Sequence, residues 1–487
     1  MLASVMASWM ITTAWIGTIP PCCATIPQRR QLSASSQLRQ SGAALAWKHL
    51  RPGTRTGPTL LALQPEPPVS APDQPEMPSV VVFAVAFLMS ACFGVIAQAL
   101  PAALMRSGSS ANAATTLGTL GSVSALVEVM LSNSFGKITD AIGRKPVLIL
   151  APALAVAARA TVVVWPSLPV LLGARFCTTL VVPLFWLAFS SSLADLYGRS
   201  STSLAIVNSR VAACMGLGYA VATLLGGKLS GVSLLGLSYV QLSYLTSCVL
   251  GSAVCLLLAL GLRETLPPER RIPFSFSGSN PLLFMRLFRR GRLQASLNGV
   301  VLLQALSNGM GDLWQVMARE LRGWGPSQCG QFASLAGLAS MSGTLLTAPL
   351  LRLLGPRTLV LGSTAASASA NLVLAHATTD RLAYGAIAPA MLGAGKAQPV
   401  SARIVNLATE AGVPQGALAA ERSTLNAIVK VVAPSVFAWA FAYGSKRGVL
   451  ALPFYLSSAL LVLSALLAAT VPADQWSSEP KGRANLA

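Results

Sequence analysis

Long apolar runs separated by short polar breaks dominate the chain from Ser79 onward. Each run reaches or exceeds the roughly 20 residues that an α-helix needs to cross about 30 Å of hydrocarbon. Helices are the expected form, because lipid leaves the backbone groups of an open strand unpaired. The pattern therefore predicts an all-α membrane protein with about twelve transmembrane helices. The runs lie at 79–105, 111–135, 146–166, 168–197, 204–227, 232–262, 293–318, 326–351, 357–378, 382–409, 414–444 and 448–472.

The longest break between runs divides the membrane region into two groups of six. It covers 263–292 and holds seven arginines. Run parity places it on the same side as the other basic breaks, so we expect that side to face the cytosol, stroma or matrix. The predicted organisation is a six-helix bundle at 79–262, this basic loop, a second six-helix bundle at 293–472 and a disordered tail at 473–487.

Residues 1–78 differ in composition from the membrane region. An uncharged apolar start is followed by an Arg- and Ser-rich stretch with no acid before Glu66, and then by a Pro-rich linker that cannot form helix. This order resembles the two-part presequence of plastids bounded by extra membranes. We therefore expect an organellar membrane, plastid before mitochondrion. The alternative is a disordered tail with an incidental apolar start, on a protein of the plasma membrane or an endomembrane.

Composition agrees with a membrane protein and excludes several other classes. Only 10% of the residues are charged, against about a quarter in soluble proteins. The formal net charge of +20 fits basic loops on one side of a bilayer. Binding of nucleic acid would need a soluble basic face with neighbouring aromatics, which the sequence lacks. The eight cysteines form no CxxC pair and there are two histidines, so we expect no disulfide framework, metal site or cofactor.

One conspicuous group of charges lies between the second and third runs, in the segment FGKITDAIGRKPVL. Four of the nine residues from Lys137 to Lys145 are charged, whereas both neighbouring stretches are almost wholly apolar. The segment is too short to be a domain, so we expect a tight turn whose glycines let the backbone approach neighbouring helix ends. Its defining residues are Gly136, Asp140, Gly143, Arg144 and Lys145.

The charges of this segment predict contacts with other helix ends. Asp140 is expected to face the N-terminus of the eleventh helix near Pro414, where the helix dipole favours an anion. Arg144 is expected to pair with Asp195 at the end of the fourth helix. We expect these contacts to form only while the two bundles meet on that side. They would therefore favour the state that is closed on that side and open on the other. The alternative is that the basic residues only set the orientation in the membrane.

The spacing G-x-x-x-D-x-x-G-R-K at 136–145 resembles the signature of the major facilitator superfamily, at that family's usual position. Arg175 near the start of the fourth helix, RETLPPE after the sixth helix and GVPQGALAAERSTLNAIVKVVAPSVF before and within the eleventh are also similar, the last to the tetracycline-efflux and drug:proton antiporter branch. The resemblance covers about residues 79–472 and implies two pseudo-symmetric bundles around a central cavity. One departure is Ala222-Thr223, where that branch carries Gly-Pro, so symport and uniport stay open.

A weak internal repeat supports the two halves. The segment APLLRLLGPRTLVL joins the eighth and ninth runs, as the motif joins the second and third. In this alignment Gly143 falls on Gly355 and Lys145 on Arg357, while Asp140 falls on Arg352. A duplicated six-helix unit is expected to keep such a segment at the same position in both halves while many of its residues diverge.

Polar and ionisable side chains inside the runs are candidates for function, because they are costly in lipid unless solvated or paired. Glu128 is the expected proton carrier, and the alternative is a structural partner for a basic group such as Arg175. Lys396 and Lys430 would make the second half of the cavity basic, which suits an anionic substrate, unless their stems only reach the interface.

Three further polar residues complete the set. Gln304 and Asn308, in the seventh run, offer hydrogen bonds to a substrate, or hold helices together. Arg159, in the third run, is expected to extend outward to the interface.

These observations predict a secondary transporter rather than an enzyme. Two bundles would rock about a central site, and a gradient, expected to be of protons, would supply the energy because the chain has no Walker-type phosphate loop. The expected substrate is a small organic solute, with a lean towards an anion, and the expected state is a monomer in the bilayer. The alternatives are a drug or metabolite exporter of the tetracycline-efflux type and a membrane receptor or scaffold without transport.

Overall fold

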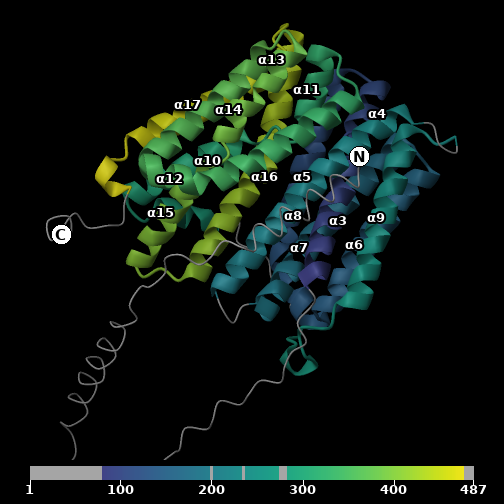
Figure 1. Cartoon of the computed structure of the whole chain (residues 1–487), viewed down its shortest axis with the longest axis horizontal. Helices are drawn as coiled ribbons and strands as arrows, with labels where there is room; N and C mark the ends of the chain where they lie inside the picture. The colour runs from purple at the N-terminus through teal and green to yellow at the C-terminus, as the bar shows by residue number, and fades with distance from the viewer. Residues whose placement is uncertain (1–78, 198–200, 233–235, 274–281, 477–487) are drawn as a thin grey trace, which may run out of the picture. The chain divides into compact units, whose positions relative to one another are not determined.

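The described part of the chain is entirely helical (Figure 1). This computed structural model describes residues 79–197, 201–232, 236–273 and 282–476. The predicted presequence and most of the predicted C-terminal tail lie outside these residues. The first residues of that tail are ordered, because Ala473–Gln475 forms the 3-10 helix η4 and Trp476 is buried in the core of the second bundle.

The first six predicted runs correspond to seven helical segments. Polar caps mark two of the starts: the Ser109 hydroxyl accepts the Asn112 N–H, and Ser238 forms a capping box with Gln241. The first run is broken into two helices near its end. The segments are α3 (Ser79–Ile96), α4 (Ala99–Ser107), α5 (Ser110–Ile142), α6 (Arg144–Val164), α7 (Leu168–Tyr197), α8 (Ser201–Lys228) and α9 (Tyr239–Gly261).

The second six runs form eight helical segments, two of the runs being interrupted. Within the long segment Pro326–His376, Gly355 has φ 74° and ψ 165°, so this segment is two helices joined by a turn. The segments are α10 (Arg292–Ser307), α11 (Leu313–Arg322), α12 (Pro326–His376), α13 (Asp380–Gly385), α14 (Ile387–Leu392), α15 (Ala397–Glu410), α16 (Gln415–Lys446) and α17 (Leu452–Ala469).

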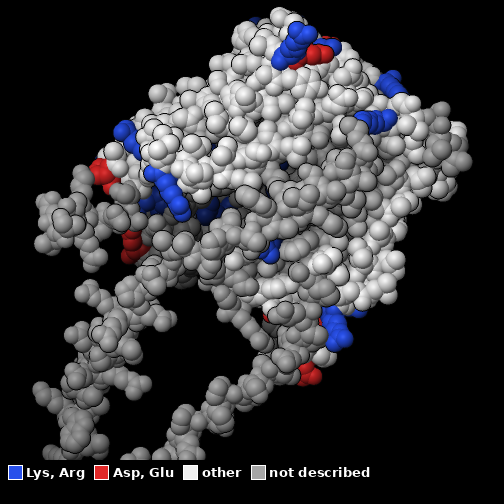
Figure 2. Space-filling view, viewed as in Figure 1, with Lys and Arg blue, Asp and Glu red and all other residues white. Residues whose placement is uncertain are grey.

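Nine of the described helices are long and apolar enough to cross a membrane. The count is lower than the number of predicted runs because α12 contains two runs and the seventh and tenth runs are interrupted. The predicted all-α membrane fold is therefore confirmed. Figure 2 shows the corresponding surface, which on that face is largely uncharged, with most charged side chains near its ends.

The turns at Gly143 and Gly355 define what we call the motif side of the membrane domain. The opposite side carries α4, α11 and α13, at the top of Figure 1. The two bundles meet through α5 with α16 and through α8 with α12. On the opposite side Gly227 of α8 and Gly330 of α12 are so close that a Cβ on either would overlap the partner's backbone, and small residues make such an approach possible.

The hydrophobic core differs between the two sides. On the opposite side one cluster joins both bundles, combining residues such as Leu100 and Tyr244 of the first with Val316, Phe437 and Phe441 of the second. On the motif side the described residues form two clusters, each drawn from a single bundle. The bundles are thus packed together on the opposite side and have separate cores on the motif side.

The basic loop at 263–292 is anchored to the second bundle at its end. Leu287, in the 3-10 helix η3 (Leu283–Phe288), is fully buried and its carbonyl accepts the Asn298 side-chain amide at 3.1 Å. Arg290 forms an ion pair of 2.5 Å with Glu421 of α16, whose side chain is 2% exposed. This end of the loop is therefore attached to α16.

Candidate functional site

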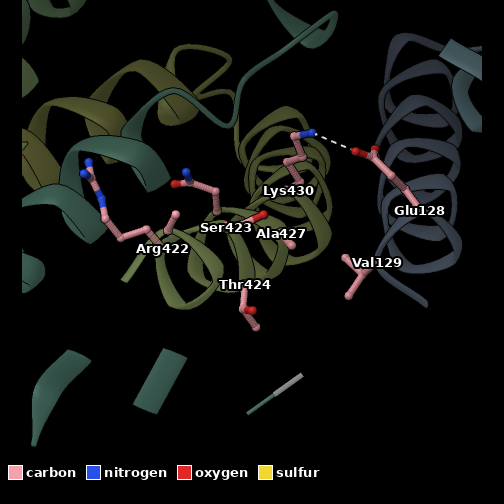
Figure 3. Close-up of a pocket in the computed structure, with 9 residues that line it drawn as sticks. Glu128, Val129, Arg422, Ser423, Thr424, Ala427 and Lys430 are labelled. Atoms are coloured by element: carbon pink, nitrogen blue, oxygen red, sulfur yellow. Dashed lines mark hydrogen bonds and ion pairs between the residues drawn. The ribbon is translucent and has the colours of Figure 1, made fainter. Parts of the chain in front are cut away.

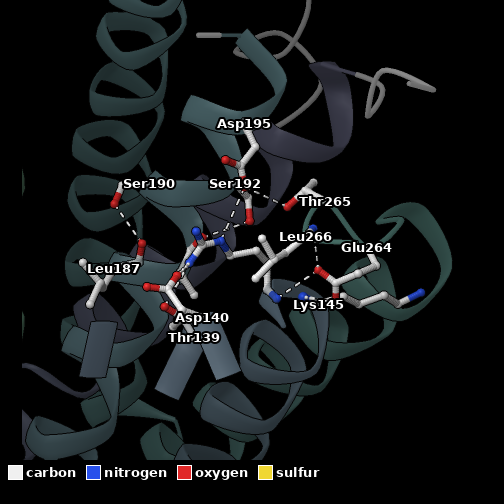
Figure 4. A network of polar contacts seen from close by, with 12 residues as sticks. Thr139, Asp140, Lys145, Leu187, Ser190, Ser192, Asp195, Glu264, Thr265 and Leu266 are labelled. Atoms are coloured by element: carbon white, nitrogen blue, oxygen red, sulfur yellow. Dashed lines mark hydrogen bonds and ion pairs between the residues drawn. The ribbon is translucent and has the colours of Figure 1, made fainter. Parts of the chain in front are cut away.

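The motif turn holds a network of polar contacts, in which Asp140, Asp195 and Glu264 are labelled in Figure 4. Arg144 pairs with Asp140 at 2.8 Å and with Asp195 of α7 at 3.4 Å, so the structure contains the expected Arg144–Asp195 pair. It also donates to the Thr139 hydroxyl at 3.0 Å. One cation therefore holds the end of α5, the start of α6 and the end of α7 together.

Glu264, just after α9, caps this turn and was not anticipated from the sequence. Its carboxylate accepts the backbone N–H groups of Arg144 at 2.9 Å and Lys145 at 3.2 Å. An anion at the first turn of α6 satisfies two free donors and complements the helix dipole. Gly143 has φ 109°, and a Cβ there would collide with the Glu264 carboxylate and the Arg271 guanidinium, so the position requires glycine.

Other expectations for the motif have different outcomes. A Cβ at Gly136 would meet Leu187 at 3.9 Å, an ordinary contact, so the close approach expected there is absent from this structure. Lys145 donates to the Ala259 carbonyl at 3.0 Å. The expected contact between Asp140 and the first turn of α16 stays a prediction: Asp140 pairs with Arg144, and the side chains at 415–416, which begin α16, lie outside the described residues.

A cavity of about 520 Å³ opens between α5 and α16 (Figure 3). Glu128 and Lys430 face each other across it, with 3.0 Å between Oε1 and Nζ. The Lys430 side chain is 61% exposed, so this ion pair is in contact with solvent. The charge of Lys430 is therefore neutralised by Glu128 in this structure and does not make the cavity basic. Arg175, which was considered as a partner for Glu128, pairs with another acid.

A second cavity, of about 300 Å³, lies inside the second bundle and brings three predicted residues together. Gln304, Asn308 and Lys396 line it together with Arg422, which was not predicted from the sequence. No Asp or Glu is among the described residues that line it. We call it the polar cavity; its other polar lining residues are Asn298, Ser401 and Asn426.

Lys396, like Arg422, has no acidic partner among the described side chains. Its Nζ lies 3.4 Å from the Gly393 carbonyl, one turn earlier, whereas Arg422 is held by the Ser401 hydroxyl at 2.8 Å. The amide of Gln304 is 2% exposed and donates to Thr364 at 3.3 Å, while its Oε1 has no partner in the described structure. The cavity therefore offers an ammonium group without an acidic partner and a carbonyl oxygen, Gln304 Oε1, without a donor.

Breaks in two helices create this arrangement. The seventh run stops at Ser307 and restarts at Leu313, and the tenth run stops at Leu392 and restarts at Ala397. Lys396 is the N-cap of α15, so the ammonium group stands beside the positive end of that helix. Discontinuous membrane helices whose N-termini face a cavity form anion sites in transporters.

Arg175 bridges the two bundles on the opposite side. Its Nη2 lies 2.8 Å from Oδ2 of Asp312, in the break between α10 and α11. Asp312 was not singled out from the sequence, although an acid inside an apolar run is a recognisable signal.

The expectation that Arg159 extends outward is wrong. Arg159 is 1% exposed, donates to the Ser247 hydroxyl of α9 at 3.0 Å and lies 4.8 Å from the centre of the Phe93 ring. It is buried because α6 packs against α9 on this face. In the described part of the chain, no three His, Cys, Asp or Glu side chains gather as a metal ion would require.

Comparison with known proteins decides the family. The family model described as Major Facilitator Superfamily matches residues 82–419, more than half of the chain. The chain belongs to the major facilitator superfamily. The predicted resemblance is thereby confirmed, together with the two-bundle fold that it implied.

Individual members of the superfamily are similar to this chain at low identity. Tetracycline resistance protein, class C, of Escherichia coli is 23% identical over 382 residues, covering 74% of this chain and 89% of that protein. The human organic anion transporter MFSD10 has a TM-score of 0.57 at 18% identity, covering 80% of this chain and 98% of that one. The nucleoside transporter NupG has a TM-score of 0.61 at 12% identity, covering 80% and 98%. These structural likenesses establish the fold of a superfamily transporter.

Proposed function

We propose that the protein is a secondary active transporter that moves a small organic anion by alternating access, as a monomer in the bilayer and coupled to protons. Lys396 carries the proposal: an ammonium group with no acidic partner among the described residues, at a helix N-terminus, in a cavity without acidic lining. A partly buried cation in that setting is stabilised by an anionic ligand. The organic anion transporter among the structural neighbours fits this substrate class.

Alternating access is supported by the asymmetry of the packing. The bundles share a core on the opposite side and have separate cores on the motif side. Opening the other way requires that the shared core separate and that the motif side close. The motif turn stands where it could form that second closure, with the Asp140 carboxylate 40% exposed.

Proton coupling is assigned to Glu128. Its carboxylate faces the cavity between the bundles and pairs with Lys430 of the other bundle. Protonation would remove the attraction between α5 and α16, so the charge state of Glu128 biases the separation of these two helices. The pair combines the two roles weighed for Glu128, proton carrier and structural partner.

Two other functions compete with this one. The tetracycline resistance relatives favour a drug or metabolite exporter of the tetracycline-efflux type, whereas the basic polar cavity favours an anion. A receptor or scaffold would keep the fold without flux. Flux of labelled organic acids into proteoliposomes separates the three: we expect saturable uptake of an organic acid that Lys396→Gln abolishes and Lys396→Arg retains. Efflux of drugs alone, or no flux, contradicts the proposal.

We further propose that residues 1–78 direct the protein to an organelle, plastid before mitochondrion. Their acid-poor, Arg- and Ser-rich composition supports this. A fluorescent protein fused to residues 1–78 should enter the organelle, and a fusion that stays in the cytosol contradicts the assignment.

A further inference from the structure

A third cavity, of about 540 Å³, continues from the polar cavity towards the opposite side of the second bundle. Part of its wall is aromatic: Trp314 and Trp324 lie 5.5 and 5.4 Å from the ring centre of Phe332. Phe454 of α17 and Tyr219 of α8 also line it, and most of the other lining residues are small or aliphatic. We call it the aromatic cavity. Trp314 is partly exposed, so one ring of this cluster faces open space.

The polar and aromatic cavities share two of their lining residues. Lys396 and Asn308 belong to both, at the breaks of the tenth and seventh runs. An ammonium group without an acidic partner among the described residues therefore stands at the boundary between a polar compartment and an aromatic one. A ligand that contacts Lys396 with one end can place its other end among the aromatic rings.

The other cation of the aromatic cavity is already engaged. Arg322 donates to the Leu374 carbonyl and lies 5.5 Å from the Trp324 ring centre. Arg322 is bonded to the wall of the cavity, whereas Lys396 has only a 3.4 Å contact with the Gly393 carbonyl. At the boundary of the two cavities the site thus offers an anion position at Lys396 beside a largely apolar, ring-lined volume. Pockets of roughly 300 to 1,000 Å³ with apolar walls and a few placed polar groups are typical of small-molecule sites.

We propose that these joined cavities bind an aromatic monocarboxylate. Its carboxylate would sit at Lys396 and the N-terminus of α15, and its ring would pack against Trp314 and Phe332. Aromatic rings pair by edge and offset stacking, and their burial adds the hydrophobic term that a short aliphatic acid lacks. The proposal rests on the proposed function and narrows its substrate class from organic anions to those with a ring.

Equilibrium binding of radiolabelled benzoate to the full-length protein in detergent tests this without requiring transport. We expect saturable binding that unlabelled benzoate displaces, while acetate (anion without ring) and benzamide (ring without charge) displace it at least about tenfold less well. Lys396→Gln and Trp314→Leu should each weaken binding about tenfold or more. Lys396→Arg and Trp314→Phe should recover most of it.

Matched control variants distinguish a local loss of benzoate binding from misfolding of the protein. Trp439, on α16, is 64% exposed, and Lys228 is exposed at the end of α8, so Trp439→Leu and Lys228→Gln should bind benzoate as the unmodified protein does. Equal displacement by acetate and benzoate overturns the aromatic proposal and leaves the anion transporter standing. Equal displacement by benzamide and benzoate overturns the role of Lys396. Absence of any benzoate binding, with acids of another type taken up in proteoliposomes, overturns the aromatic proposal alone.

Discussion

Arg175 of α7 and Asp312, between α10 and α11, join the two bundles through a hydrogen-bonded ion pair of 2.8 Å. The side chains are 32% and 33% exposed, so the pair is partly accessible to solvent. It lies on the side where the bundles also share their hydrophobic core. The pair therefore contributes to closure of the opposite side, and any state that opens this side must break it.

Neutralising either member should loosen that closure. We expect Asp312→Asn and Arg175→Gln each to lower the melting temperature in detergent by a few degrees, with a coupling energy of about 1 kcal/mol in the double-mutant cycle, because the pair is partly solvated. Arg106→Gln, an exposed cation at the end of α4, is the control and should have no effect. Strict additivity of the two substitutions would show that the pair does not stabilise this state.

Glu128→Gln should uncouple transport from the proton gradient. The amide keeps a hydrogen bond to Lys430 but has no proton to exchange, so accumulation driven by a pH gradient should be lost while exchange of labelled for unlabelled substrate continues. Parallel gradient-driven and exchange assays in proteoliposomes measure this. Accumulation that persists in the variant assigns the proton to another group.

Asp140→Asn should slow transport while the protein inserts normally. The substitution removes the charge that pairs with Arg144 here and that is expected to meet the start of α16 when the motif side closes. We expect transport rates to fall about tenfold, equivalent to about 1.4 kcal/mol. Glu320→Gln, an exposed acid on α11, serves as control. Rates equal to those of the unmodified protein would leave Asp140 with no part in gating.

Glu264→Ala should destabilise the motif turn without touching the cavities. It leaves two N–H groups at the start of α6 without their acceptor, which costs about 0.5 to 2 kcal/mol at a helix N-terminus. Thermal melting in detergent should shift down by a few degrees, whereas Glu269→Ala, an exposed acid five residues later, should not shift it. Identical melting of the two variants would mean that water replaces the cap fully.

The helices were predictable because any helix that crosses a bilayer needs an apolar run of sufficient length. The breaks at 308–312 and 393–396 were not predicted, because each is short and lies inside a run that is otherwise long and apolar. The glycine-rich stretches SNGMGD and GAGK are the signal that marks them. These two breaks shape the polar cavity.

Pairings between side chains were predictable only where helix parity put both partners at one membrane surface. Arg144 and Asp195 meet this condition. Glu128 and Lys430 are separated by most of the chain and meet because α5 packs on α16, which depends on the packing of the whole domain. Arg159 was misjudged for the same reason, since the neighbour that buries it comes from α9.

Alternating access is the central claim, and a single cysteine at Asn308 tests it most directly. Asn308 is exposed, lines both the polar and the aromatic cavity, and lies on the motif-side flank of the Arg175–Asp312 pair. In protein with its native cysteines replaced, Asn308→Cys would be exposed to a membrane-impermeant maleimide added to one side of oriented vesicles at a time. We predict reaction from the motif side, slower reaction from the opposite side, and acceleration of the latter by Asp312→Asn. Reaction from the motif side alone, unchanged by Asp312→Asn, would contradict the account.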